Sequence, residues 1–420
     1  MSIEIQSLVN SGRIHEAAYL AKLNAIDALQ MAALLYSKAN DLYSIELANI
    51  CVSLEPQNPK LYGNLSFFLG HLNYCEQALD VINKAIELSP TKDYYHQRAI
   101  LFASMKRIEE AIIDYKKVLE FEPDNHYVKF NIGCMYMLLG NYKEALPLLE
   151  NRFKYDEELI KFRKRYDKPD WDGSDIKGKK LLIFNEQGLG DVIQSIRYVP
   201  LIRNMELIAE LQEDLVPLVS DFFDITIGRA ADFNIEDPPN LPEYDYVVSF
   251  SSLANLLDPE LKMIPFAYLP STFKPIKDNK LNIGIVWAGN SSQSNDINRS
   301  CPVECFRVLS KMDNIKLYNL QKGKEVDFAI SCKLDNFKDT ADVINQLDIV
   351  ITVDTAVAHL AGAMGKSTFL LLSYCHGIPW LLNSNLTPLY PSIIIFHQSK
   401  IGDWEGVMEE VVQFLYGPDR

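Results

Sequence analysis

Small and apolar residues in the first third of the chain recur with a period near 34, which is typical of stacked helix pairs. Stacking buries a face that one pair alone would leave exposed, and small residues at fixed positions let the helices approach closely. The pattern therefore predicts a helical repeat array over residues 1–160, with 1–24 as a degenerate first unit. Prolines close successive units and an alanine holds one position in each: Pro56, Pro90, Pro123, Ala78, Ala111 and Ala145.

The pattern changes after Lys179, where short apolar runs alternate with helix-like segments. This alternation predicts parallel α/β sheets. A turn-rich stretch at 169–173 precedes the first run, and three prolines between Pro265 and Asp278 indicate a hinge. We therefore expect α/β domains over 170–272 and 273–420. The expected strands are 181–184, 207–209, 246–249, 283–287, 316–318 and 349–351.

Two of these runs lead through a loop into a helix-like pattern, at Gly188-Leu189-Gly190-Asp191 and at Asp354-Thr355-Ala356. The first turns of a helix leave backbone N–H groups unpaired, and such a terminus attracts phosphate. Two such termini about 160 residues apart predict two facing α/β halves with an anionic ligand in the cleft.

Composition narrows the class of protein. The 420 residues are 48% hydrophobic and carry a net charge of −15, which disfavours nucleic acid as a partner. No apolar run is long enough to span a membrane, and the N-terminus shows no export signal, so we expect a cytoplasmic protein. Seven irregularly spaced cysteines indicate reduced thiols. The Asp170-Trp171-Asp172 triplet precedes the first strand and is interpreted as a surface turn, so we expect no metal site.

The unit from Phe130 to Leu146 resembles a tetratricopeptide repeat closely. It has small Gly133 where two helices approach, a turn at Gly140 and small Ala145. The resemblance implies a concave groove for a polypeptide. A structural spacer or a dimerisation element is the alternative.

The remaining motifs together resemble one group, the bacterial tetratricopeptide-repeat glycosyltransferases, whose C-terminal part is similar to heptosyltransferases of the GT-B fold. The resemblance covers about Trp171 to Trp404, and it implies tetratricopeptide helices followed by a GT-B pair of Rossmann-like domains. It also implies metal-independent inverting sugar transfer from a nucleotide-sugar co-substrate, with no further cofactor. The motifs are Glu186 to Asp191 with Arg197-Tyr198, Ile285 to Asn290 with Asn295-Asp296 and Asn298 to Ser300, and Asp354 to Gly362.

The resemblance suggests a role for each matching residue. Asp191 would be the general base, although as a residue it equally suits a helix N-terminus. Thr355 and His359 share one helix face and would donate hydrogen bonds to the donor diphosphate, with Asp354 and Ala356 in the same loop. A core histidine is the alternative for His359.

Further donor contacts are expected from the strand-end loops. Arg299 would neutralise the departing diphosphate, or else form a surface salt bridge. Gly188 and Gly190 are also predicted to bind the donor, although they lack the third glycine of a dinucleotide fingerprint. The other predicted donor-binding residues are Trp287, Asn290, Gln321 and Lys322.

One segment departs from the group's pattern. Where the group has an Asp-Trp-Arg-Trp run, this chain has His376-Gly377-Ile378-Pro379-Trp380. The arginine is missing, which puts the donor's identity in doubt. Two alternatives stay open: a repeat scaffold that has lost catalysis, and a heptosyltransferase of the lipopolysaccharide core.

Overall fold

The computed structural model describes residues 2–11, 13–21, 29, 31, 41–202, 204–230, 233–235, 240–263, 266–269, 276, 278–290 and 296–416. The chain forms two compact units, Met1–Met135 and Tyr136–Arg420. The expected domain bounds at 160, 170 and 273 stay predictions. The hinge expected between Pro265 and Asp278 lies partly outside the described residues. The Asn295 position lies wholly outside them.

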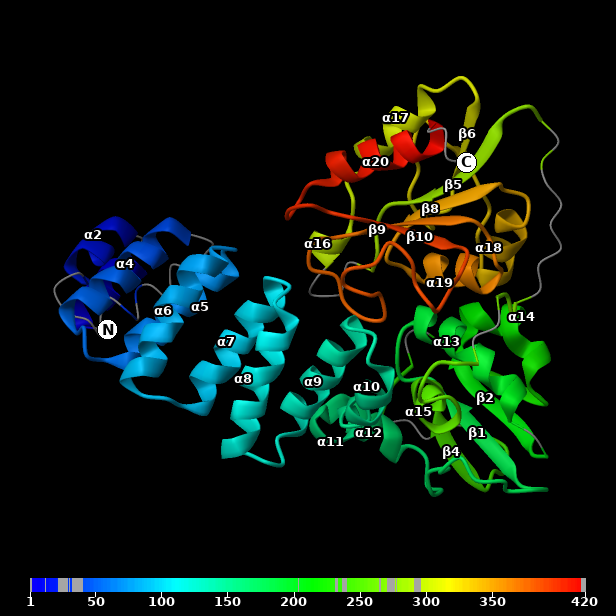
Figure 1. The fold of residues 1–420 in the computed structure, drawn as a ribbon, viewed down its shortest axis with the longest axis horizontal. Coiled ribbons are helices and arrows are strands. Elements are labelled where there is room, and N and C mark those ends of the chain that lie inside the picture. Colours follow the sequence, from blue (N-terminus) through cyan, green and yellow to red (C-terminus); the bar gives the residue numbers. More distant parts are fainter. Residues whose placement is uncertain are drawn as a thin grey trace. The chain divides into compact units, whose positions relative to one another are not determined.

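Helices follow one another along the repeat region, as the periodicity predicts (Figure 1). Helices α5 and α6 form one antiparallel pair and α7 and α8 form the next, while α1 and α2 occupy the expected degenerate unit as far as it is described. The helices are α1 (Ile3–Asn10), α2 (Ile14–Ala21), α4 (Asp41–Leu54), α5 (Pro59–His71), α6 (Cys75–Leu88), α7 (Lys92–Ser104), α8 (Ile108–Phe121) and α9 (His126–Leu138).

Small residues let these helices pack closely. Ala78 and Ala111 are 0% exposed. A Cβ atom on Gly63 would come within 2.8 Å of the Tyr94 ring, so only glycine fits where α5 meets α7 without movement of that ring. The predicted helical repeats are therefore confirmed, together with their spacing.

The segment after the repeats forms short helices that cover the first sheet. They are α10 (Tyr142–Leu149), α11 (Arg152–Tyr155) and α12 (Glu157–Lys164). Phe162 of α12 and Tyr166 pack against Leu182 and Phe184, which alternate along β1 with Leu181 and Ile183 on the opposite face. This period of two is that of a strand buried on both sides.

The first sheet has four parallel strands in the order β3-β2-β1-β4. Its second face is covered by short helices whose apolar residues form the largest core cluster. The strands are β1 (Lys180–Phe184), β2 (Glu206–Gln212), β3 (Ile225–Arg229) and β4 (Tyr246–Ser249). The helices are α13 (Leu189–Ser195), η1 (Ile196–Leu201), η2 (Glu213–Leu215), α14 (Val216–Val219), η3 (Ser220–Phe222), η4 (Phe250–Ser252) and α15 (Leu253–Leu257).

The second sheet has six parallel strands in the order β10-β9-β8-β5-β6-β7. Helices α18 and α19 cover one face, and α17 and α20 cover the other. The strands are β5 (Leu281–Val286), β6 (Ile315–Asn319), β7 (Ile330–Ser331), β8 (Ile349–Val353), β9 (Thr368–Leu372) and β10 (Ile393–His397). The helices are α16 (Asp296–Arg299), η5 (Val303–Phe306), α17 (Arg307–Ser310), α18 (Phe337–Ile344), α19 (Ala356–Ala363) and α20 (Trp404–Tyr416).

All six expected strands are present, so the prediction of parallel α/β structure is confirmed. Strands β3, β7, β9 and β10 were not expected. The helix-like pattern after β1 forms α13, which begins at Leu189 and gives way to a 3₁₀ helix at Ile196. Pro200 lies inside that 3₁₀ segment, where its missing N–H prevents a regular α-helical hydrogen bond.

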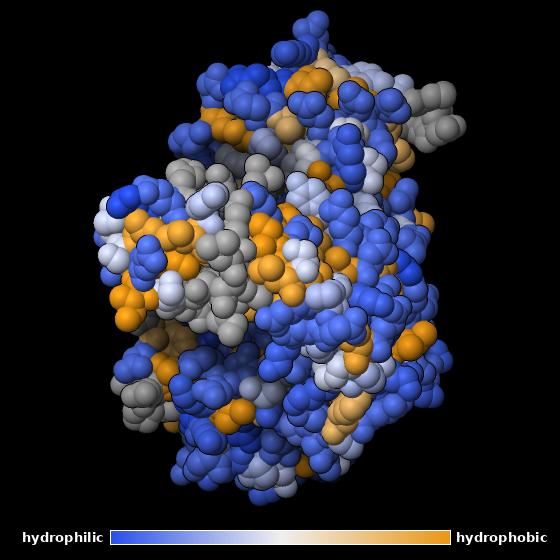
Figure 2. All heavy atoms as spheres, turned by 90° about the vertical axis from the view of Figure 1, so that its left-hand side faces the viewer, coloured by the Kyte–Doolittle hydropathy of each residue, from blue (hydrophilic) through white to orange (hydrophobic). Residues whose placement is uncertain are grey.

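On the face shown in Figure 2, the surface is predominantly hydrophilic and hydrophobic side chains form separate clusters. Across the described ranges, every helix is too short or too polar to cross a lipid bilayer. In the same residues, no three His, Cys, Asp or Glu side chains gather in a way that could hold a metal ion.

Candidate functional site

A cavity of about 850 Å³ opens at the carboxyl ends of both sheets, the edge at which parallel α/β folds bind ligands. Its volume lies within the range of sites for small molecules. Residues of both sheets line it. Eleven of the predicted site residues belong to its wall: Gly188, Gly190, Asp191, Asn290, Arg299, Gln321, Lys322, Asp354, Thr355, Ala356 and His359.

Asp191 lies in the first turn of α13, directly after the loop that follows β1. Its Oδ2 atom accepts a hydrogen bond of 3.0 Å from the Gly188 N–H, so the residue does cap the helix. The side chain is open to the cavity, but the cavity walls limit its solvation. This burial raises the pKa of Asp191 to about 6, with smaller contributions from the charges of Glu186 and Asp354.

Helix α19 begins at the opposite wall. Thr355 is its N-cap residue, but the Thr355 side chain makes no cap hydrogen bond and instead lies 3.1 Å from the Thr352 hydroxyl. Asp354 accepts a hydrogen bond of 2.9 Å from the Trp380 indole, and burial raises the pKa of its carboxyl group. The first amides of the helix therefore point toward the cavity without a side-chain cap.

His359 stands one turn into α19 and is 6% exposed. Its Nδ1 atom lies 2.9 Å from the Tyr390 hydroxyl, and its ring stacks on Trp380. Burial, aided by the charge of Arg197, lowers the pKa of His359 to about 3, so the imidazole is neutral at physiological pH. A neutral ring that accepts the Tyr390 proton at Nδ1 carries its own proton at Nε2.

Gly190 marks the close approach of the two halves. A Cβ atom there would come within 2.8 Å of His359 Cδ2 and 3.5 Å of Ala356 Cα. A side chain at position 190 would thus push α13 away from α19. His359 is packed in the core and also reaches the cavity wall, so its hydrogen bond to a donor diphosphate stays a prediction.

Arg299 approaches the cavity from α16 and is fixed by a glycine. A Cβ atom on Gly289 would lie only 2.0 Å from Arg299 Nη2, so the guanidinium rests on the bare backbone of the loop after β5. Arg299 pairs with Asp296 at 3.3 Å, while its Nε atom is buried without a hydrogen-bond partner among the described residues. The cation therefore retains unmet hydrogen-bonding capacity beside the cavity.

Gln321 and Lys322 follow β6 and have different roles in the structure. The Gln321 Oε1 atom accepts the backbone N–H groups of Trp287 and Ala288 at 3.2 and 2.9 Å, which fixes the loop after β5. Lys322 forms an ion pair of 3.3 Å with Asp214 of the first half. Trp287 is absent from the cavity wall, because its side chain packs in the core of the second sheet.

Sequence reasoning missed several wall residues. Some of them follow β2 and β3. Strand β3 was not predicted from the sequence, so the residues after it were not predicted either. Others begin α18. The loop that departs from the group's pattern, which the resemblance had already placed near the donor, also reaches the wall through His376 to Pro379. The remaining wall residues include Gln212, Asp214, Arg229, Phe233, Asn336, Phe337 and Thr340.

Arg197 holds the two halves together behind the cavity. Its guanidinium donates to the Leu389 carbonyl at 3.0 Å and to the Tyr268 hydroxyl at 3.1 Å. It also lies over the Tyr390 ring, 4.7 Å from the ring centre. The motif arginine thus acts as structural support for His359 through Tyr390.

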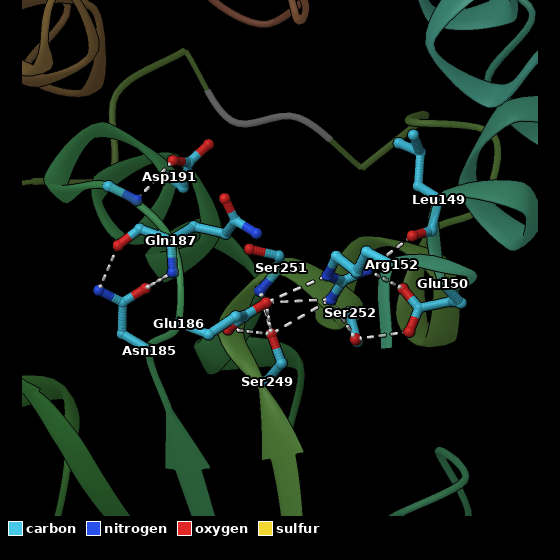
Figure 3. Close-up of polar contacts among 11 residues, drawn as sticks. Leu149, Glu150, Arg152, Asn185, Glu186, Gln187, Asp191, Ser249, Ser251 and Ser252 are labelled. Atoms are coloured by element: carbon cyan, nitrogen blue, oxygen red, sulfur yellow. Dashed lines mark hydrogen bonds and ion pairs between the residues drawn. The ribbon is translucent and has the colours of Figure 1, made fainter. Parts of the chain in front are cut away.

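The loop before Asp191 is fixed by a dense polar network (Figure 3). The Asn185 side chain binds the Gln187 backbone at both N–H and carbonyl, at 3.0 Å each. Glu186 is held by Arg152 and Ser249. This loop is therefore tied on two sides before the chain enters α13.

Known proteins resemble this chain in its repeats above all. A family model described as tetratricopeptide repeat matches residues 93–125. Protein FlbA of Caulobacter vibrioides is 23% identical over 420 residues, which are 89% of this chain and 69% of FlbA. The N-terminal region of this chain is accordingly a tetratricopeptide-repeat region, followed by parallel-sheet α/β structure.

A link to sugar transfer is partial. The UDP-N-acetylglucosamine–peptide N-acetylglucosaminyltransferase of Giardia intestinalis is 31% identical over 130 residues, which are 30% of this chain and only 9% of that enzyme. Among solved structures, MamA matches 38% of this chain and 98% of its own, with 21% identity and a TM-score of 0.34.

Proposed function

We propose that this chain is a glycosyltransferase whose two sheets form a GT-B pair, and that it moves a sugar from a nucleotide-activated donor to an acceptor. The observation that carries this proposal is that Asp191 and the uncapped start of α19 line one cavity. A carboxylate able to take a proton and a terminus able to hold an anion then flank one reaction centre.

The donor side would be the second sheet. The first amides of α19 attract the donor diphosphate, and Arg299 neutralises the charge that grows on it as the sugar departs. The neutral His359 donates a hydrogen bond to the same group from Nε2 in the tautomer whose Nδ1 accepts from Tyr390. The Gly289 backbone and Gln321 keep the Arg299 loop in place.

The acceptor side would be the first sheet. Asp191 takes the proton of the acceptor hydroxyl as its oxygen attacks the anomeric carbon, and the bond from that carbon to the diphosphate oxygen breaks. The sugar is transferred with inversion and the nucleoside diphosphate leaves. A pKa of about 6 suits this base, because it is ionised at neutral pH and still holds a proton well.

The acceptor is proposed to be a protein segment held by the repeats. The tetratricopeptide match and the partial likeness to a peptide-modifying enzyme of Giardia support this choice. A catalytically inactive scaffold is the second candidate. It is favoured by the His376–Pro379 segment, which lines the cavity where the resembled group has an arginine.

The test is release of nucleoside diphosphate from a panel of nucleotide sugars. The wild type is expected to release nucleotide with one of them, and Asp191→Asn to lose release but still bind. Arg299→Gln should weaken binding. The matched controls are Asp221→Asn and Arg307→Gln, two exposed or partly exposed residues outside the cavity wall. Neither release nor diphosphate binding with any donor would contradict the transferase proposal and leave the scaffold.

A further inference from the structure

Arg152 and Glu186 form a buried ion pair that no step of the proposed reaction uses (Figure 3). The Arg152 side chain is 5% exposed and that of Glu186 is 0% exposed. Arg152 Nε and Nη2 donate to Glu186 Oε1 at 3.2 and 3.1 Å, so two N–H groups of the guanidinium converge on one carboxylate oxygen.

Two serines complete the pair. Ser249 donates to Glu186 at 2.6 Å and accepts from Arg152 at 3.3 Å. Ser252 accepts from Arg152 at 2.9 Å and donates to Glu150. The fork of Arg152 therefore joins three parts of the fold, which are its own helix α11, the end of β4 and the loop after β1. A lysine could not occupy all of these positions, because its single ammonium lacks the planar fork.

The network bears on Asp191 through the backbone. Glu186 lies two residues before Gly188, whose N–H binds the Asp191 carboxylate at 3.0 Å. Asn185 fixes the intervening residue, Gln187. Resting on the proposed function, we infer that Arg152 and Glu186 are positioning residues that hold the Asn185–Gly190 loop, and with it the Asp191 carboxylate, at the reaction centre.

Glu186 also acts on Asp191 directly. Its negative charge helps to raise the pKa of Asp191. Burial in turn raises the pKa of Glu186, while Arg152 opposes that rise and favours the ionised form. The ion pair therefore supplies both geometry and a nearby charge.

The main test uses the double variant Arg152→Met with Glu186→Gln, which removes both charges of the buried pair and nearly preserves volume. Glu150, which also pairs with Arg152 at 2.9 Å, is partly exposed and keeps its contact with solvent. Hydrogen exchange of the backbone amides of 185–191 is followed by mass spectrometry, with 349–364 of the second sheet as internal reference. We expect exchange in the loop to be at least about tenfold faster, with the reference unchanged. Loop exchange equal to the wild type would overturn the inference.

The matched control is Lys180→Met with Glu206→Gln, an ion pair at the amino ends of β1 and β2. It should leave exchange of the 185–191 amides at the wild-type rate. Equal acceleration in the control and in the Arg152–Glu186 variant would show a general loosening of the sheet and would also overturn the inference. If the double variant does not fold, Arg152→Lys is used, and a smaller acceleration of the same amides is expected.

The second measurement is the titration of Asp191 by carboxyl ¹³C NMR, assigned by comparison with Asp191→Asn. Glu186→Gln should lower the titration midpoint, and an unchanged midpoint would contradict the coupling. In the transferase assay, kcat of Glu186→Gln should fall, while its affinity for inorganic pyrophosphate should stay near the wild-type value. Exchange and titration decide the positioning role even if the wild type transfers no sugar, in which case only the proposed function fails.

Discussion

Replacing Asp191 with asparagine should stabilise the α/β part of the chain above pH 6 while abolishing transfer. The folded structure raises the pKa of this carboxyl group from 3.8 to about 6. Folding therefore favours the protonated form, and the ionised form is the less stable one in the folded state. The stability supplied by the protonated group is complete below pH 3.8 and is lost as the pH rises through about 6.

The pKa change corresponds to about 3 kcal/mol between the two protonation states, which is an upper limit. Because the side chain is open to the cavity, solvent screening reduces this amount, and we expect about 1–2 kcal/mol at about pH 8. Asparagine keeps an oxygen that can accept the Gly188 N–H, so the helix cap is preserved. Such a gain in stability is expected where function requires a group that destabilises the folded state.

The assay is urea unfolding of both proteins at several pH values, followed by tryptophan fluorescence. All four tryptophans lie between Trp171 and Trp404, so the signal reports on the α/β part and not on the repeats. They are at most 6% exposed, so unfolding changes their surroundings strongly. The two proteins should have equal stability near pH 4, diverge as the pH rises from about 4 to about 6, and differ by a constant amount at higher pH.

A stability difference that does not change with pH would refute the reasoning, since a lost packing contact has no such dependence. In the transferase assay, kcat/KM of the wild type should rise as the pH passes about 6. His359 stays neutral over this range and should add no second inflection.

Three further substitutions test the support around the cavity. Gly289→Ala should displace the Arg299 guanidinium and weaken diphosphate binding at least about tenfold by calorimetry, with an unchanged circular dichroism spectrum; unaltered binding would remove Arg299 from the donor site. Tyr390→Phe leaves His359 Nδ1 without its partner and should lower the free energy of unfolding by about 1–3 kcal/mol in urea, an effect that a solvated histidine would not show. Gln321→Leu leaves two buried amides unpaired and should lower the free energy of unfolding by about 1–3 kcal/mol. Gln321→Glu keeps the acceptor and should lower the free energy of unfolding less.

Local pattern was sufficient for much of the fold. The repeat spacing determined where helices pair, since Ala78 and Ala111 must be small for the helices to touch. The apolar runs located six strands, because buried parallel strands are apolar on both faces. Strand β3 was not predicted because its sequence, Ile-Thr-Ile-Gly-Arg, is short and only partly buried.

The sequence by itself determined the two helix starts after β1 and β8, which depend on glycines and capping residues within a few positions. It also indicated which charged and polar residues follow those strands. The folded chain alone shows that eleven of the predicted site residues, from segments after four different strands, line one cavity and that Trp287 does not. Likewise, the pairing of Arg152 with Glu186 joins positions 34 residues apart through Ser249, far beyond the range of local pattern. A pKa such as that of Asp191 depends on burial and on distant charges, so it exists only once the chain has folded.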